Sequence, residues 1–265
     1  MLLKKKNIIP IPEVVNAESS LDGKVAMVIG GTGGIGAAIT TELIHSGCKV
    51  ITCGSSLESI EKAKNTMLES DNLKYFQFNL IRSKEYLQKI KKAEEIFGKI
   101  DILIFSAGVH SEKFDYFTMT EQEYDRVMEI NLKAPFFLCQ SFANYLINEK
   151  RAGHICLISS SRGFEPAYTP YGISKWGMNG MTKGIAKELI KYGIVVNAVA
   201  PGSTATPLIG VTNHDSIATD ENCYGRLIHP NEVANIVKMI VGETGNMLVG
   251  ETVRISGGRG IFDIR

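Results

Sequence analysis

Short apolar runs alternate with segments of helical period along most of this chain of 265 residues. Seven of the runs have the character of buried strands, and they cover residues 25–30, 49–53, 74–78, 101–105, 154–159, 194–200 and 252–256. Between them, apolar residues recur with the period of a helix, as at Ile35, Ile39 and Leu43 within residues 35–46 and again within residues 57–70. Thr120 and Glu123 have the spacing of a capping box, which predicts a helix start. The pattern predicts an α/β fold with a doubly wound, mainly parallel sheet of seven strands and helices on both faces.

One domain carries this pattern, because no linker rich in Pro, Gly or Ser interrupts it. Residues 1–22 lack a clear period and contain two prolines, so we expect an N-terminal extension there and the domain in residues 23–265. Residues 207–226 are mostly polar or small, and the segment comes directly after the end of a predicted strand. Ligands of open α/β sheets bind outside the carboxyl ends of the strands, so this segment is the predicted substrate lid.

Composition narrows the class of ligand. The 29 Lys and Arg residues nearly balance 28 Asp and Glu residues, and no block of five or more like charges occurs, so the chain is not expected to bind nucleic acid. The five cysteines form no CxxC pair and the five histidines have no metal-ligand spacing, which favours a reducing, cytoplasmic setting without a metal site. No window approaches the roughly 18 apolar residues of a membrane span. A small-molecule ligand is the remaining expectation.

The first predicted strand leads into the stretch Gly30-Gly31-Thr32-Gly33-Gly34-Ile35-Gly36 and then into a helix. Glycines permit a tight turn here, let backbone N–H groups approach a pyrophosphate, and let the helix pack close to the sheet. Its position in the first turn of a doubly wound pattern favours a dinucleotide site in a Rossmann fold. The expected contacts are Gly30, Thr32, Gly33, Gly34, Ile35 and Gly36.

The turn after the second predicted strand bears on the choice of cofactor. A carboxylate about 20 residues beyond the glycine loop would hold the ribose 2′-hydroxyl of NAD. This chain has Cys53-Gly54-Ser55-Ser56 there instead. Without the repulsion of a carboxylate, two hydroxyls and backbone N–H groups could accept a 2′-phosphate, so NADP is favoured over NAD. Ser55 and Ser56 are equally compatible with a simple cap for the helix that begins at Leu57.

Tyr171 and Lys175 stand four residues apart, which places both on one face of a helix. A free phenol has a pKa of about 10, and an adjacent ammonium lowers it toward the range of an acid–base catalyst. The run Ser159-Ser160-Ser161 ends the fifth predicted strand, and one of these hydroxyls could orient a substrate oxygen. Taken singly, a half-buried tyrosine and a solvated lysine are the commoner explanation.

Together and in order, these motifs resemble those of the short-chain dehydrogenase/reductase family. The further matches are Ser106-Ala107-Gly108, Asn131-Leu132, Asn197-Ala198-Val199-Ala200-Pro201-Gly202 and Gly257-Gly258. The resemblance extends from about residue 21 to residue 258. Within the family, the chain is similar to 3-oxoacyl-acyl-carrier-protein reductases and to the sugar or polyol dehydrogenases that resemble them.

The resemblance implies a catalytic tetrad of Asn131, Ser160, Tyr171 and Lys175. Tyr171 would be the proton donor or acceptor, and Lys175 would lower its pKa and bond the nicotinamide ribose. Asn131 would hold a water that links Lys175 to solvent, while Ser160 would orient the reacting oxygen. The further cofactor contacts that it implies are Gly54, Ser55, Ser56, Asn79, Leu80, Ser106, Ala107, Gly108, Pro201, Gly202, Thr204 and Thr206, together with Tyr171 and Lys175.

Three features depart from the family's pattern. Ser106 stands where the family has an asparagine that braces the central sheet, and Asn79 stands where an aspartate often contacts adenine. The interval of 11 residues from Ser160 to Tyr171 is shorter than usual, which leaves the choice among the three serines open. Ser160 is preferred because Gly163 follows it at the family's spacing.

Several side chains near these motifs are candidates for the substrate pocket. Tyr168 lacks a lysine partner, because position 172 is glycine, and is expected to form a pocket wall. His110, Phe164, Trp176 and Met178 are further candidates, although such residues beside a sheet more often belong to the core.

The predicted function is that of an NADP-preferring oxidoreductase that interconverts a ketone and a secondary alcohol by hydride transfer, with Tyr171 as acid or base. A 3-oxoacyl-acyl-carrier-protein reductase and a sugar or polyol dehydrogenase both remain open, with a non-catalytic NAD(P)-binding regulator as a rival. An epimerase or dehydratase of the extended branch is disfavoured, since 265 residues leave no room for a longer substrate domain. The resemblance also implies a homotetramer or homodimer, built through helices near residues 120–150 and 171–192 and through the last strand.

Overall fold

The structure, a computed structural model, describes residues 21–211 and 215–261. The predicted N-terminal extension therefore lies outside the described residues apart from Leu21 and Asp22, and the predicted lid is described except for residues 212–214. Leu21 is buried, and its N–H donates to the carbonyl of Ser46 at 2.8 Å. The packed fold thus already includes Leu21.

The described chain forms one sheet of seven parallel strands, which confirms the predicted sheet. Across the sheet the order is β3-β2-β1-β4-β5-β6-β7. Each strand end lies within one residue of its predicted position, because a strand buried on both faces is a nearly continuous apolar run with clear limits. The strands are β1 (Val25–Ile29), β2 (Lys49–Gly54), β3 (Leu73–Gln77), β4 (Ile102–Phe105), β5 (Gly153–Ile158), β6 (Ile194–Pro201) and β7 (Thr252–Ile255).

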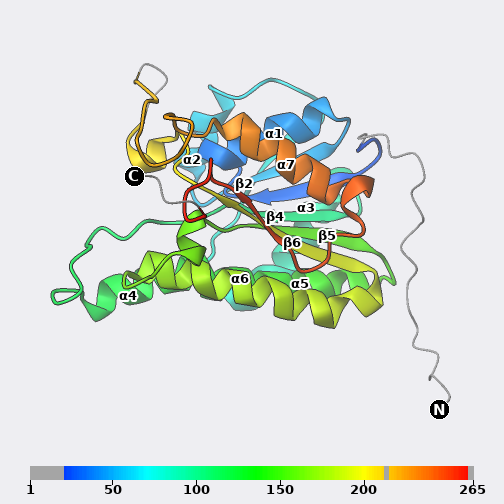
Figure 1. Cartoon of the computed structure of the whole chain (residues 1–265). Coiled ribbons are helices and arrows are strands. Elements are labelled where there is room, and N and C mark those ends of the chain that lie inside the picture. The colour runs from blue at the N-terminus through cyan, green and yellow to red at the C-terminus, as the bar shows by residue number, and fades with distance from the viewer. Residues whose placement is uncertain (1–20, 212–214, 262–265) are drawn as a thin grey trace, which may run out of the picture.

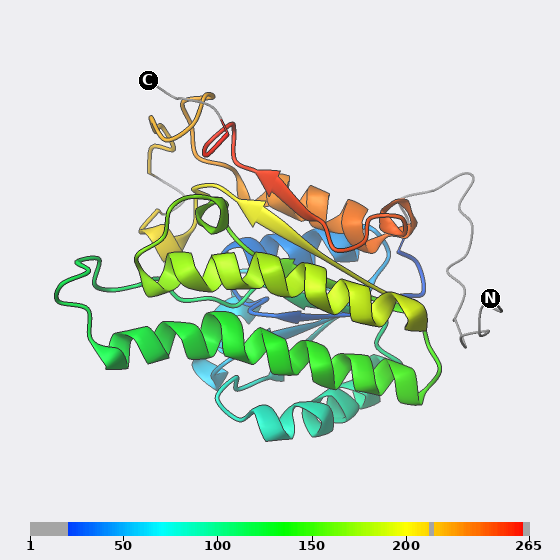
Figure 2. The ribbon, with the colours of Figure 1, turned by 60° about the horizontal axis from the view of Figure 1, so that its bottom comes forward.

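Helices cover both faces of the sheet (Figure 1). The α-helices are α1 (Gly34–His45), α2 (Leu57–Lys64), α3 (Tyr86–Phe97), α4 (Glu121–Met128), α5 (Ala134–Asn148), α6 (Pro170–Leu189) and α7 (Pro230–Val241). Helices α1 and α7 lie on one face, whereas α5 and α6 lie side by side on the other (Figure 2). Alternate residues of β1 enter two separate apolar clusters, with Met27 on the α5 and α6 side and Val28 on the α1 and α7 side. In the described part of the chain, no helix is both long and apolar enough to cross a membrane.

Helix α2 is shorter than its apolar period. The period predicts a helix through residue 70, but α2 ends at Lys64 with Asn65 as its C-cap. Beyond it, Thr66 Oγ1 donates to the carbonyl of Lys62 at 3.1 Å. Met67 and Leu68 still pack against a core cluster from the turn that follows. The predicted length is wrong because these two residues continue the apolar pattern without continuing the helix.

The predicted helix start at Thr120 is confirmed, but only half of the capping box forms. Thr120 Oγ1 accepts the N–H of Glu123 at 3.3 Å, and α4 begins at Glu121. The Glu123 carboxylate accepts the N–H of Glu112 at 2.7 Å and pairs with Arg126 at 2.8 Å. A partner from the preceding loop has therefore replaced the N–H of the N-cap residue.

The strand order places a switch point between β1 and β4. From β1 the chain proceeds outward through β2 and β3, and it then returns to the other side of β1 for β4. Ligands of open parallel sheets bind at the carboxyl ends of the strands beside such a point. The glycine loop follows β1, and the Ser106 and Ser160 segments follow β4 and β5 at the same edge. The predicted site residues therefore converge on one edge of the sheet.

Candidate active site

The glycine loop leaves room for a phosphate chain at the start of α1. Gly30 has a φ of +77°, and a Cβ built on it would lie 2.6 Å from the backbone nitrogen of Ala107. A Cβ at Gly36 would lie 2.1 Å from the carbonyl oxygen of Gly30, so a side chain at either glycine would displace the loop. Gly33, the N-cap residue, offers no side-chain cap, which leaves the first N–H groups of α1 available to an anion. These residues fit a dinucleotide pyrophosphate.

Residues from other strand ends lie against the same loop. Thr206, from the loop after β6, has its methyl carbon 3.4 Å from the Cβ position of Gly34. The Cβ position of Gly54, at the end of β2, is 3.0 Å from the methyl carbon of Thr32. The remaining predicted contacts at this edge are Ser106, Ala107 and Gly108 after β4, and Pro201, Gly202 and Thr204 at the end of β6. The structure thus brings together segments that are far apart in the sequence.

The turn after β2 combines helix capping with exposed polar groups. Ser56 Oγ accepts the N–H of Ser59 at 3.1 Å and caps α2, so the capping interpretation is confirmed for this serine. The hydroxyl proton of Ser56 remains available for donation, and Ser55 is exposed.

Two further predicted contacts follow β3. Asn79 Oδ1 accepts the N–H of Ile81 at 2.9 Å and orders its own turn. Leu80 is buried in the core.

Tyr171 and Lys175 lie in the first turns of α6. The Lys175 Nζ atom is 5.6 Å from the centroid of the Tyr171 ring and donates to the carbonyl of Ile158 at 2.9 Å. Burial lowers the pKa of Lys175 to about 8. Burial raises the pKa of Tyr171, although a hydrogen bond with Ser160 and two nearby arginine charges oppose the rise. The net direction is opposite to the lowering predicted from Lys175, because burial outweighs the favourable interactions of the phenolate.

The three serines after β5 have different surroundings. Ser159 Oγ donates to Oδ1 of Asn179 at 2.6 Å and so takes part in the packing of α6. Ser161 is buried at the start of the short helix η3 (Ser161–Phe164). Ser160 Oγ accepts the N–H of Arg162 at 3.2 Å and is hydrogen-bonded to Tyr171. Among the three, Ser160 is the serine that lies beside the tyrosine.

Asn131 lies in the π-helical turn η2 (Glu129–Lys133), which joins α4 to α5, and it is fully buried. Its side chain accepts the N–H of Val109 and donates to the carbonyl of Val109, with both distances at 2.9 Å. A Cβ at Gly108 would lie 3.5 Å from Asn131 Oδ1 and 3.8 Å from Lys175 Nζ. The turn therefore fixes the loop after β4 against the lysine, and π-bulges of this kind are frequent at functional sites.

The candidate pocket residues differ in their burial and contacts. Met178 is fully buried in the core and therefore cannot line a pocket. Tyr168 is 59% exposed. Trp176 is also largely exposed, and its Nε1 atom donates to the carbonyl of Glu165 at 2.5 Å. His110 stacks on Tyr171, with the ring centroids 4.1 Å apart and 16° between the planes.

An ion-pair cluster beside the site was not predicted from the sequence. Arg259 Nε donates to Glu165 at 2.9 Å, and its Nη1 atom contacts Ser203 at 3.0 Å and the carboxylate of Glu221. The cluster joins the turn after β7 to the segment after η3, the loop after β6 and the lid. Arg259 and Glu165 are 94 residues apart in the chain, so no local pattern could indicate their contact.

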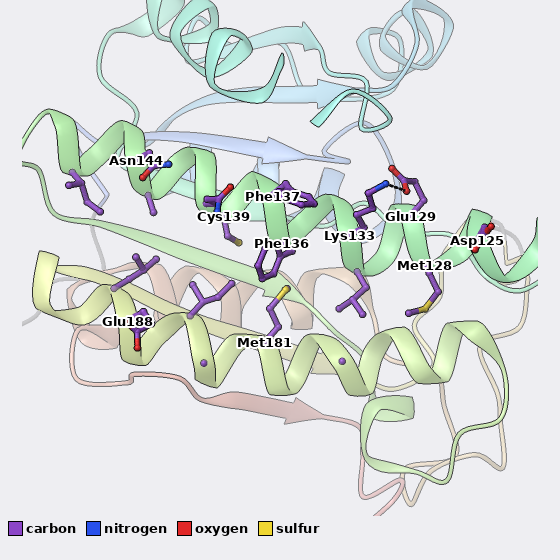
Figure 3. Close-up of a pocket in the computed structure, with 18 of the residues that line it drawn as sticks. Asp125, Met128, Glu129, Lys133, Phe136, Phe137, Cys139, Asn144, Met181 and Glu188 are labelled. Atoms are coloured by element: carbon purple, nitrogen blue, oxygen red, sulfur yellow. Dashed lines mark hydrogen bonds and ion pairs between the residues drawn. The ribbon is translucent and has the colours of Figure 1, made fainter. Parts of the chain in front are cut away.

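A broad groove of about 1270 Å³ lies away from these residues, between α5 and α6 (Figure 3). Phe136 of α5 and Met181 of α6 are directed toward the space between the two helices. Among the described residues that line this groove, none belongs to the predicted tetrad. The groove is an apolar helix surface, separate from the edge of the sheet that carries the predicted site residues.

Comparison with known proteins adds to this geometry. The family model of the short chain dehydrogenases matches residues 24–216. The chain is 31% identical over 247 residues to the 3-oxoacyl-[acyl-carrier-protein] reductase of Aquifex aeolicus. The matched region covers 91% of this chain and 99% of that reductase. It is 33% identical over 242 residues to the acetoacetyl-CoA reductase of Acinetobacter sp., which covers 89% of this chain and 97% of that protein.

Solved structures have the same fold. A dehydrogenase/reductase from Sinorhizobium meliloti superposes with a TM-score of 0.75 at 28% identity, covering 91% of this chain and 96% of the other. The actinorhodin polyketide ketoreductase, solved with NADPH, has a TM-score of 0.82 at 24% identity, covering 93% and 100%. At that identity, the second likeness speaks for the fold alone.

Proposed function

The chain belongs to the short-chain dehydrogenase family and is an NAD(P)-dependent oxidoreductase acting on carbonyl and alcohol groups, and we propose that it reduces a 3-oxoacyl thioester with NADPH. The observation that carries this proposal is the meeting of Ser160, Tyr171 and Lys175, at the same edge of the sheet as the glycine loop. The substrate class is supported by the two similar reductases, one named for 3-oxoacyl and one for acetoacetyl thioesters.

Tyr171 is the proposed proton donor. Burial raises its pKa, so the phenol keeps its proton at neutral pH. The alkoxide that develops at a substrate carbonyl is a stronger base than a phenolate, so proton transfer from the Tyr171 hydroxyl is favourable. This protonation state favours reduction near neutral pH, because oxidation of an alcohol would require the phenolate as the base.

Ser160 and Lys175 stabilise the charges that move in this step. The Ser160 hydroxyl accepts a backbone N–H and is hydrogen-bonded to Tyr171, and its single proton would turn to the carbonyl oxygen when a substrate binds. With a pKa of about 8, Lys175 is mainly an ammonium at neutral pH, and its charge stabilises the phenolate that remains after the proton has left. Asn131 holds the loop after β4 in place, and, as the family resemblance implies, it would also hold a water that links Lys175 to solvent.

The residues at the carboxyl edge of the sheet would hold the cofactor. A bound reduced nicotinamide supplies the hydride that the carbonyl carbon accepts. The glycine loop would bind the pyrophosphate at the N-terminus of α1, while Pro201, Gly202, Thr204 and Thr206 would border the nicotinamide end. The preference for NADP is supported by the Ser55 and Ser56 hydroxyls, which replace the expected carboxylate at the turn after β2.

Cofactor binding and turnover test the proposal in sequence. The purified protein is titrated with NADPH and with NADH by nicotinamide fluorescence, and acetoacetyl-CoA and longer 3-oxoacyl thioesters are then assayed by loss of NADPH absorbance. Simple ketones, and polyols with NADP⁺, serve as comparison substrates. We expect tighter binding of NADPH and a kcat/KM for the best thioester about tenfold or more above that for any comparison substrate.

Other results would redirect the assignment. Turnover of a polyol without turnover of thioesters would make the protein a polyol dehydrogenase. Tight cofactor binding without turnover of any substrate would favour a regulator, and binding of neither cofactor would contradict the whole proposal.

We also propose that a second copy of the chain covers the groove between α5 and α6, which gives a homodimer or homotetramer. Phe136 is 45% exposed there, and a twofold axis would bring the same apolar surface of a second copy against it. Sedimentation should show an oligomer for the unaltered protein and a smaller species for Phe136→Asp, which is a monomer if the unaltered protein is a dimer and a dimer if it is a tetramer. Met239→Asp is the matched control, because Met239 is 37% exposed on α7, on the other face of the molecule. A Met239→Asp variant that dissociates, or a Phe136→Asp variant that keeps the size of the unaltered protein, would contradict the proposal.

The proposed compartment is the cytoplasm. All five cysteines are free, and four of them are buried, a state that a reducing compartment preserves. Fractionation of the producing cells would test this assignment, and recovery from an oxidising compartment would contradict it.

A further inference from the structure

His110 packs face to face on the proposed proton donor. The imidazole and the Tyr171 phenol are 4.1 Å apart between centroids, with 16° between their planes. His110 is half-buried in the loop after β4, whereas Tyr171 lies at the start of α6. The imidazole therefore covers one face of the phenol, and a ring packed at this distance removes the space in which the phenol could turn.

The backbone that carries His110 is fixed one residue at a time. Four consecutive loop residues each take part in a hydrogen bond with a neighbouring helix or helical turn. The bonds join Val109 to Asn131, the carbonyl of His110 to Arg126, the hydroxyl of Ser111 to the N–H of Tyr171, and the N–H of Glu112 to Glu123, at 2.7–3.3 Å. These bonds hold the loop backbone in place and thereby fix the position of the His110 side chain.

The charged groups around the imidazole are mainly cationic. Burial lowers the pKa of His110, and Lys175 from α6 and Arg162 from η3 lower it further. Arg126 of α4 reaches the carbonyl of His110, and its own charge is balanced by its ion pair with Glu123. His110 is therefore neutral at neutral pH, and the stack consists of two neutral rings.

We propose that His110 is a positioning residue of the reaction, which acts by fixing the plane of the Tyr171 phenol and keeping water from one face of it. This inference rests on the proposed function, in which Tyr171 transfers the proton. The contact is with Tyr171, so loss of the stack should change kcat more than KM. The cover also contributes to the burial of the phenol, so its loss should admit water and bring the pKa of Tyr171 back toward its ordinary value.

Two substitutions separate the flat ring from the imidazole nitrogens. His110→Ala removes the ring, and we expect kcat to fall about tenfold with a smaller change in KM. His110→Phe keeps a flat neutral ring without nitrogen atoms, and it should restore most of the lost kcat. His110→Leu replaces the alanine variant if that variant does not fold, because leucine fills the space without a planar face.

A second measurement is independent of turnover. Tyrosinate absorbance after a rapid upward pH jump is recorded for each variant and for the same variant carrying Tyr171→Phe, so that the difference reports Tyr171 alone. We expect the pKa of Tyr171 to be raised in the unaltered protein and in His110→Phe, and to be lower in His110→Ala or His110→Leu.

The two measurements give distinguishable failures. An alanine or leucine variant with unchanged kcat and unchanged Tyr171 ionisation would overturn the proposal. A phenylalanine variant as slow as the alanine variant would also overturn it, since the nitrogens and not the ring would then matter. If the unaltered protein reduces no carbonyl compound, the proposed function fails, and the ionisation of Tyr171 alone decides whether His110 covers it.

Discussion

Ser159 Oγ donates a hydrogen bond of 2.6 Å to Oδ1 of Asn179, and this bond ties the end of β5 to the middle of α6. Asn179 in turn donates to the carbonyl of Gly163 at 2.9 Å. The two bonds fix the segment on which Ser160 lies, so the position of Ser160 beside Tyr171 does not depend only on its own bond with the N–H of Arg162. Adjacent serines thus have separate tasks, one structural and one proposed to be catalytic.

Substitution of the two serines should separate these tasks. Ser160→Ala removes a donor to the substrate oxygen, and we expect kcat to fall about 10²-fold. The N–H of Arg162 also loses its acceptor, so we expect a loss of about 0.5–1.5 kcal/mol in the free energy of unfolding. Ser159→Ala leaves the buried oxygen of Asn179 without its donor, and we expect a loss of about 1–3 kcal/mol in the free energy of unfolding. Steady-state kinetics and urea unfolding of both variants check this; the reverse assignment of effects would show that Ser159 is the substrate serine.

Tyr171→Phe should abolish turnover and leave cofactor binding intact. The substitution removes only the ionisable oxygen and keeps a ring for His110 to stack on. We expect the rate to fall by about 10²–10⁴-fold, while fluorescence titration gives a cofactor affinity close to that of the unaltered protein. Tyr168→Phe is the matched control, because Tyr168 is 59% exposed and has no lysine partner on α6. Unchanged turnover in Tyr171→Phe would remove the tyrosine from the mechanism.

The pH dependence of reduction should report Lys175. Burial lowers its pKa to about 8, so Lys175 is mainly an ammonium at neutral pH and loses its charge as the pH rises through about 8. Because the ammonium stabilises the phenolate product of proton transfer, we expect kcat for reduction to fall on the alkaline side of that value. In Lys175→Arg the guanidinium stays charged, so this alkaline fall should disappear even if the overall rate is lower. A wild-type profile that stays flat through this range would contradict the assignment.

The sheet could be predicted closely because its strands are buried on both faces. Residues 25–29, for example, are all buried, and alternate side chains enter opposite clusters, so the strand reads as an unbroken apolar run. The length of α2 could not be predicted in the same way. Met67 and Leu68 bury apolar surface from a turn, and burial alone does not reveal the backbone conformation that achieves it.

The candidate site could be proposed from residue types in the sequence, but its contacts could not be predicted. Tyr171 and Lys175 have a local spacing, so their shared helix face followed from the sequence. The choice of Ser160 depends on Asn179 of α6, because Asn179 accepts the hydrogen bond of the Ser159 hydroxyl. No sequence pattern shows this contact. The same holds for Glu123. Its carboxylate accepts the N–H of Glu112 in place of the local N–H of a capping box, and only the folded loop brings Glu112 near. Contacts across the chain therefore decide the geometry that local patterns leave open.

Arg259 should control the position of the lid. Its side chain is 14% exposed and pairs with Glu165 and Glu221, so it joins the lid to the segment after η3. Arg259→Met keeps the length of the side chain but leaves the two carboxylates without their common cation, and such a loss at a partly buried site is destabilising.

We expect Arg259→Met to raise KM for the substrate about tenfold with a smaller change in kcat, because a loosened lid positions the substrate less well. Trypsin should also cleave faster after Arg226, at the end of the lid. Arg82→Met is the control, because the Arg82 side chain is 71% exposed in a surface pair with Glu85, and such pairs contribute only about 0–1 kcal/mol. If Arg259→Met matched the unaltered protein in both KM and cleavage rate, the ion-pair cluster would have no part in holding the lid, and the hydrogen bonds of the lid itself would suffice.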